Sequence, residues 1–149
     1  MSTSRAPLAL LVASWIAAPG CPSGGGEPCM VDGDCARGEE CTRPGDCVAE
    51  GTALRVIVRW TVLGEAPTPA APGPCDDIAE LAVVFEGGFE PERYRPVPCE
   101  LGQAVYDKMP PHFKWVHVIA YDDAGDLLDR RSQLLEPTGE SDVTVDLAP

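Results

Sequence analysis

The stretch LRVIVRWTV, residues 54–62, decides the fold class of this chain. Its apolar residues recur at every second position, and Arg55 and Arg59 fall between them. A period of two is typical of a β-strand with one buried face and one mostly exposed face. Because Trp60 lies on the apolar side, we expect it in the core.

Strand-like patterns with turn residues between them continue to the end of the chain, and no helical periodicity of useful length follows residue 21. The prolines within residues 89–98 favour an edge strand there, because proline donates no hydrogen bond to a ladder. Seven short strands predict an all-β fold, an antiparallel β-sandwich over residues 52–149. The other expected strands are residues 78–86, 89–98, 103–107, 113–121, 127–135 and 143–147.

Two cysteines bracket the second and third expected strands. Gly87-Gly88 is a turn signal between these strands, and Cys75 and Cys99 are equally distant from Gly87 in the sequence. Opposite residues of an antiparallel hairpin have position numbers of constant sum, so a turn at Gly87 would bring the two cysteines together. We therefore predict a Cys75–Cys99 disulfide, which closes a loop of about 24 residues and contributes roughly 3 kcal/mol.

A cysteine-rich segment precedes the sandwich. Residues 29–47 read CMVDGDCARGEECTRPGDC, with five residues between neighbouring cysteines and almost no apolar residue. Zinc motifs usually space their first ligands two to four residues apart, so we expect two disulfides to stabilise a small module over residues 29–49. Three pairings are open to its four cysteines, Cys29, Cys35, Cys41 and Cys47.

The first twenty residues have the parts of a secretory signal. Met1–Arg5 is polar with one positive charge, and Ala6–Ala18 is an apolar run that is too short to span a membrane. Ala18-Pro19-Gly20-Cys21 resembles the lipobox of bacterial lipoproteins, which implies a signal peptide over residues 1–20 and a palmitate-type lipid anchor on Cys21. The alternative is a secreted soluble protein in which Cys21 forms a disulfide.

The cysteine count supports the lipobox. The chain has seven cysteines, and taking Cys21 for lipid leaves six that can all pair. Disulfides imply an oxidising compartment, so we expect an outer-membrane or cell-surface lipoprotein that faces the periplasm or the exterior. The segment 21–28, rich in glycine, is expected to be a flexible tether between the anchor and the module.

The chain is strongly acidic. Its formal net charge is −13, from 24 acidic and 11 basic residues; without residues 1–20 it loses Arg5 and reaches −14. Such a charge argues against nucleic acid as a partner and against electrostatic binding to anionic membranes. We therefore expect the chain to contact the membrane through its lipid anchor and not through surface charge.

Two family resemblances follow from these motifs. The cysteine spacing, with Asp32-Gly33-Asp34 and Gly38-Glu39-Glu40, is similar to short Dickkopf-N-like modules. The stretches LRVIVRWTV, VHVIAYDDAGDLL and VTVDL, with the two cysteines that bracket the second and third strands, resemble carboxypeptidase-regulatory-like or prealbumin-like sandwiches. Relatives commonly have Pro-x-Gly-x-Tyr where this chain has Pro-Pro-His-Phe at residues 110–113. The resemblance implies an accessory domain without chemistry of its own.

No catalytic residues are predicted. His112 and His117 are the two histidines. The residue types of a catalytic triad are present in Ser132, His117 and an aspartate, but nothing places these residues together. The nucleophile elbow, the phosphate loop and the dinucleotide motif are all absent from the sequence. We expect a protein that is not an enzyme and needs no cofactor.

The segment 113–121 offers the best candidate for a binding surface. Trp115, Ile119 and Tyr121 share one of its faces and form an aromatic stripe for a protein or glycan partner, unless they pack against a neighbouring element. A weaker metal candidate follows at the turn of Asp122, Asp123 and Asp126, where turn chemistry is a sufficient explanation, so no metal is predicted.

These expectations give one favoured function and two others. The favoured function is a membrane-anchored, non-catalytic envelope lipoprotein with a structural or binding role. The second is a cysteine-rich recognition or inhibitor module that is presented on a β-sandwich spacer. The third is an envelope enzyme with an unrecognised site.

Overall fold

The computed structural model describes residues 27–88 and 90–149. The expected signal peptide, Cys21 and most of the tether lie outside these residues. Among the described residues, no helix has the length and hydropathy that crossing a membrane requires.

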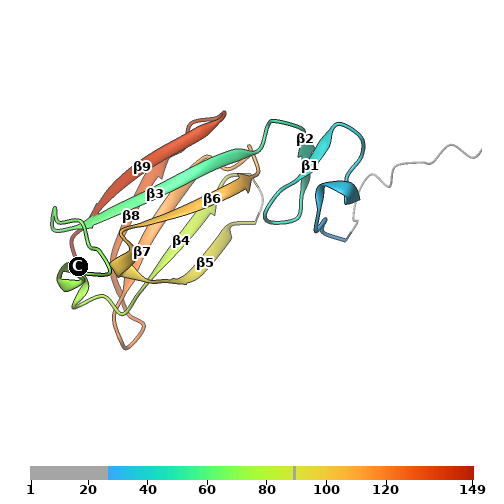
Figure 1. Ribbon diagram of the computed structural model, residues 1–149. Coiled ribbons are helices and arrows are strands. Elements are labelled where there is room, and N and C mark those ends of the chain that lie inside the picture. The colour runs from blue at the N-terminus through green and yellow to red at the C-terminus, as the bar shows by residue number, and fades with distance from the viewer. Residues whose placement is uncertain (1–26, 89) are drawn as a thin grey trace, which may run out of the picture.

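Two β-sheets form a sandwich from the seven strands of residues 54–147 (Figure 1). The first sheet has the order β6 (Gln103–Met109), β3 (Leu54–Val62), β9 (Glu140–Leu147). The second has the order β5 (Glu92–Val97), β4 (Glu80–Glu86), β7 (Trp115–Tyr121), β8 (Leu127–Leu134). The predicted all-β sandwich is therefore confirmed. One pair departs from the antiparallel arrangement, because the first and last strands of the sandwich, β3 and β9, run parallel.

The core lies between the two sheets and follows the alternation of the sequence. In β3, the residues at every second position from Leu54 to Val62 are at most 2% exposed, whereas Ile57 on the other face is half-buried. Trp60 is 1% exposed, as expected, and its indole N–H donates to the carbonyl of Cys99 at 2.7 Å, which satisfies the polar atom of a buried ring. The inner face of the second sheet contributes Leu81, Val83, Phe85, Val116, Val118 and Ala120.

The Cys75–Cys99 disulfide is confirmed, with Cα atoms 5.9 Å apart. The predicted hairpin register is not: Phe85 pairs with Glu92, whereas a turn centred on Gly87 would pair it with residue 89. A β-bulge also shifts the register between Leu81 and Val83. The cysteines therefore meet beyond the paired residues, in the short 3₁₀ helices η2 (Gly73–Cys75) and η3 (Cys99–Leu101).

The cysteine-rich segment forms a small unit at one end of the sandwich, which we call the module (residues 29–49) (Figure 1). It consists of the 3₁₀ helix η1 (Asp32–Asp34) and an antiparallel pair, β1 (Glu39–Cys41) and β2 (Cys47–Ala49). Two disulfides, Cys29–Cys41 and Cys35–Cys47, take the place of an apolar core. Together with Cys75–Cys99 they indicate an oxidising, extracytoplasmic environment that is compatible with export.

Candidate functional site

The outer face of the four-stranded sheet carries the predicted stripe and most of the candidate chemistry. Residues that pair across strands point to the same side of a sheet. Val84 of β4 pairs with both Arg93 of β5 and His117 of β7, and His117 pairs with Ser132 of β8. These four residues therefore form one row across the sheet, on the face that is turned away from the core. We call this face, with its residues from β4, β5, β7 and β8, the outer face.

A hydrogen-bonded network occupies the centre of the outer face. The imidazole Nδ1 of His117 lies 2.7 Å from Ser132 Oγ, and its Nε2 lies 2.8 Å from Glu86 Oε2. His117 is 6% exposed, although it faces outward. The prediction that nothing brings Ser132 and His117 together is therefore wrong. The signal that could have found this pair is the hairpin turn at residues 122–126, since folding the chain there places residue 117 close to residue 132.

The network has the order of a serine–histidine–carboxylate triad, so its surroundings can be compared with what acyl transfer needs. That reaction needs hydrogen-bond donors that converge where the oxyanion develops. His117 lies in β7, between two strands, and Ser132 lies in the edge strand β8; the backbone N–H groups of both strands point within the plane of the sheet. Around Ser132, the described backbone therefore presents no pair of N–H groups above the sheet. The arrangement instead satisfies both nitrogens of a buried imidazole.

The predicted stripe is only partly open to solvent. Trp115 is 44% exposed, and its cross-strand partner Leu134 is 56% exposed. Ile119 is 6% exposed and packs in a small cluster with neighbouring apolar residues. The ring of Tyr121 lies 4.3 Å under the guanidinium of Arg95, measured from the ring centroid. Of the three stripe residues, Trp115 is therefore the one that offers a free ring.

In the acidic turn after β7, which holds Asp122, Asp123 and Asp126, the carboxylate of Asp122 serves local structure. Asp122 Oδ1 accepts hydrogen bonds from the N–H groups of Ala124, at 2.9 Å, and Asp126, at 2.8 Å. This is the turn chemistry that the sequence predicts. Among the described residues, the group whose ligand atoms lie close enough for a metal is Cys29, Cys35 and Cys41, and disulfides occupy all three.

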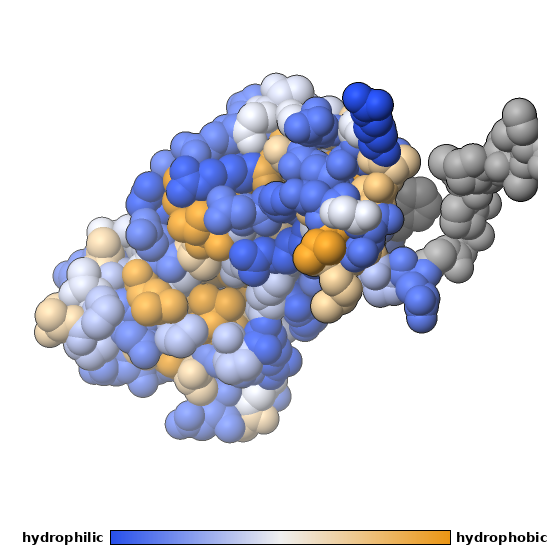
Figure 2. Space-filling view, turned by 45° about the vertical axis from the view of Figure 1, so that its right-hand side comes forward, coloured by the Kyte–Doolittle hydropathy of each residue, from blue (hydrophilic) through white to orange (hydrophobic). Residues whose placement is uncertain are grey.

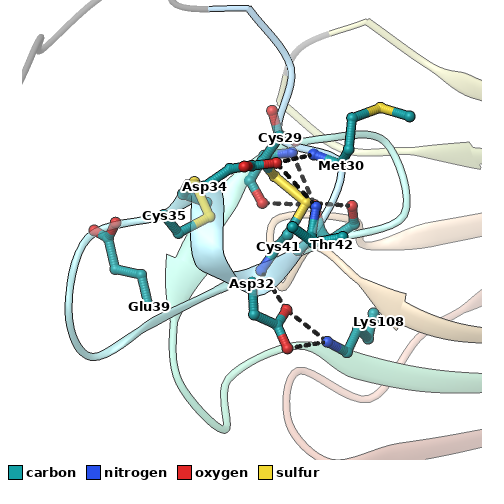
Figure 3. Close-up of a disulfide and its surroundings, with 12 residues drawn as sticks. Cys29, Met30, Asp32, Asp34, Cys35, Glu39, Cys41, Thr42 and Lys108 are labelled. Atoms are coloured by element: carbon teal, nitrogen blue, oxygen red, sulfur yellow. Dashed lines mark hydrogen bonds and ion pairs between the residues drawn. A yellow bond between two sulfur atoms is a disulfide. The ribbon is translucent and has the colours of Figure 1, made fainter.

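The junction between the module and β6 is a second candidate site (Figure 3). Lys108 Nζ lies 2.7 Å and 2.8 Å from the two carboxylate oxygens of Asp32, and the Lys108 carbonyl accepts from the Arg43 N–H at 2.8 Å. The Arg43 guanidinium lies 5.8 Å and 5.9 Å from the ring centroids of Tyr94 and Tyr106. These contacts hold the module against the end of the sandwich at which Lys108, Tyr94 and Tyr106 lie.

A groove of about 540 Å³ runs along this junction. It is lined by module residues, including Met30 and Val31, and by Asp107 and Lys108 of β6. Met30 is 84% exposed and Val31 is 60% exposed. The face of the molecule that Figure 2 shows is mostly hydrophilic, with small, separate hydrophobic patches. Sequence reasoning missed this junction, because nothing local to Lys108 marks it as a partner of Asp32.

Comparisons of the chain with models of protein families, with curated proteins and with solved structures found no match. The resemblances to Dickkopf-N-like modules and to carboxypeptidase-regulatory-like sandwiches therefore stay predictions.

Proposed function

We propose that this chain is an exported lipoprotein, anchored through a lipid on Cys21, whose sandwich binds a partner and does not catalyse a reaction. The observation that carries the proposal is the pairing of the cysteines. Three disulfides use all six cysteines from Cys29 to Cys99. None of these six is left to form a disulfide with Cys21. Cys21 is therefore the one unpaired cysteine of the seven, as attachment of a lipid at the lipobox requires.

The outer face supports a binding role for the anchored protein. Trp115 and Leu134 expose large apolar side chains directly opposite each other, beside the polar network of His117. An exposed tryptophan that is flanked by hydrogen-bonding groups is typical of a recognition surface. The module lies at one end of the sandwich, so an anchor at Cys21 would leave the side of the sheet accessible.

Membrane fractionation tests the anchor. The wild-type chain should sediment with membranes, and Cys21→Ala should release it into the soluble fraction. The matched control is the double variant Cys75→Ala/Cys99→Ala, which loses cysteines without losing the lipobox and should stay with the membranes. A Cys21→Ala chain that fractionates like the wild type contradicts the proposal.

A second candidate function is recognition by the module itself, which the exposure of Met30 and Val31 beside the junction groove favours. Capture of partners from the native envelope distinguishes binding by the outer face from binding by the module. Trp115→Ala/Leu134→Ser should abolish capture if the outer face binds the partner. Met30→Ser/Val31→Ser should abolish it if the module does.

A further inference from the structure

The outer face is a basic area on an acidic protein. The chain has a formal net charge of −13. On the outer face, however, the arginines of the described residues outnumber the glutamates. The charged residues on this face are Arg93, Arg95, Arg130, Glu80 and Glu86. A ligand with negative charge is therefore attracted to this face and repelled by the surface around it.

One of these arginines is free to bind a ligand. Arg95 forms an ion pair with Glu80 and lies over the Tyr121 ring, and Arg130 lies 4.0 Å from Glu86. Arg93 is exposed, and its guanidinium has no hydrogen-bond or ion-pair partner among the described residues. A planar guanidinium with its donors unused is suited to a carboxylate, which it can bind with two parallel hydrogen bonds.

Trp115 adds a flat apolar platform to the same face. Two strand spacings, about 10 Å, separate β5 from β7, and Trp115 lies one row, about 7 Å, along the sheet from the row of Arg93. His117 of β7 and Ser132 of the edge strand β8 lie in the same row as Arg93, on the far side of β4 from it. The face therefore presents a stacking ring, the exposed hydroxyl of Ser132 and a free cation over the span of several sugar units.

The size of the apolar area distinguishes between classes of partner. A stable protein–protein interface buries about 800 Å² on each side and has an apolar centre. Among the described residues of this face, the large exposed apolar side chains are the pair Trp115 and Leu134 and, at the other end of β7, Leu127, which pairs with Tyr121. The pair Trp115 and Leu134 matches the apolar face of a single sugar ring better than the centre of a protein interface.

We propose that the outer face binds an acidic polysaccharide whose sugars carry carboxylates, with Trp115 stacking on a sugar ring and Arg93 pairing with a carboxylate. The proposal rests on the binding role given to this face above and names its ligand. Its experiment is a calorimetric titration of the full-length chain, in mild detergent, with oligogalacturonate. Neutral dextran oligomers and poly-glutamate serve as comparison ligands.

Oligogalacturonate should bind, neutral dextran should not, and added salt should weaken the binding. Trp115→Ala and Arg93→Gln should each raise Kd by about tenfold or more, because each removes a principal contact. Trp115→Phe keeps a ring and should retain most of the affinity. The matched controls are Arg37→Gln and Leu101→Ser, exposed residues outside this face, which should bind like the wild type.

The proposal is overturned if the wild-type chain does not bind oligogalacturonate, or if Trp115→Ala and Arg93→Gln bind it unchanged. Equal affinity for poly-glutamate also overturns it, since charge alone would then explain the binding. These failures differ from failure of the proposed function. If Trp115→Ala/Leu134→Ser still abolishes capture from the envelope, the face binds a partner of another class.

Discussion

Lys108 and Asp32 join the two parts of the described chain, with the lysine ammonium 2.7 Å and 2.8 Å from the two carboxylate oxygens (Figure 3). Lys108 has a positive φ of 56°, which turns the end of β6 toward the module. Its carbonyl also accepts the Arg43 N–H. One residue therefore fixes the module through both its backbone and its side chain.

This ion pair should be visible as a shifted titration of Asp32. The Lys108 ammonium, and after it the Cys41 N–H, hold the pKa of the Asp32 carboxyl below its ordinary value of 3.8. The stabilisation is present above pH 3.8 and is lost as the pH falls through the lowered pKa. Lys108→Met should raise the pKa of Asp32 toward 3.8 in an NMR titration of the carboxyl carbon. Lys114→Met is the control and should leave it unchanged.

The two tyrosines under Arg43 predict a loss of stability at alkaline pH. Burial raises the pKa of Tyr94 to about 12 and also raises the pKa of Tyr106 above its ordinary value of 10. The folded chain therefore binds these protons more tightly than the unfolded chain does, so the free energy of unfolding falls as the pH rises above 10. Urea denaturation between pH 8 and pH 12 measures this slope. Tyr94→Phe should reduce it, and an unchanged slope contradicts the explanation.

The backbone atoms packed against Gly87 predict that adding a single methyl group at this position lowers the free energy of unfolding strongly. A Cβ at this position would lie 2.4 Å from the carbonyl oxygen of His112 and 2.7 Å from the backbone N of Lys114. Because both neighbours are backbone atoms, Gly87→Ala should destabilise the chain by at least about 2 kcal/mol. A Cβ at Gly73 meets nothing within 4 Å, so Gly73→Ala should stay within about 0.5 kcal/mol of the wild type. Equal stability of the two variants in thermal unfolding would contradict this packing.

The Ser132–His117–Glu86 network should act as structure and not as a nucleophile. We expect a fluorophosphonate probe to leave Ser132 unmodified, because the described residues around it offer no oxyanion site. Ser132→Ala should cost about 1 kcal/mol in urea denaturation, since it removes one hydrogen bond from a buried imidazole. Stoichiometric labelling of Ser132 that disappears in His117→Ala would show instead that the network is catalytic.

The strands could be predicted from the sequence because each has its own signal. Period-two alternation in residues 54–62 and the turn residues between segments are local features, and the burial pattern of β3 follows the alternation. The Cys75–Cys99 pair was also predictable, since a disulfide tolerates the small error in register that the β-bulge near Leu81 introduces.

The remaining features depend on elements that are distant in the sequence. The parallel β3–β9 pair joins the two ends of the sandwich, so no local pattern reports it. The network needs the registers of β4, β7 and β8 together before Glu86 reaches His117. The pairing of Cys29 with Cys41 follows from how η1 folds over β1, in a segment with too few apolar residues to indicate it.

The lipid anchor proposed on Cys21 can be observed by mass spectrometry of the peptide that begins at this residue. We predict that the mature chain starts at Cys21, that this residue carries the mass of acyl chains, and that the other six cysteines are recovered as Cys29–Cys41, Cys35–Cys47 and Cys75–Cys99. An unmodified Cys21, or a Cys21 recovered in a disulfide with another chain, would show that the protein is not anchored through this residue.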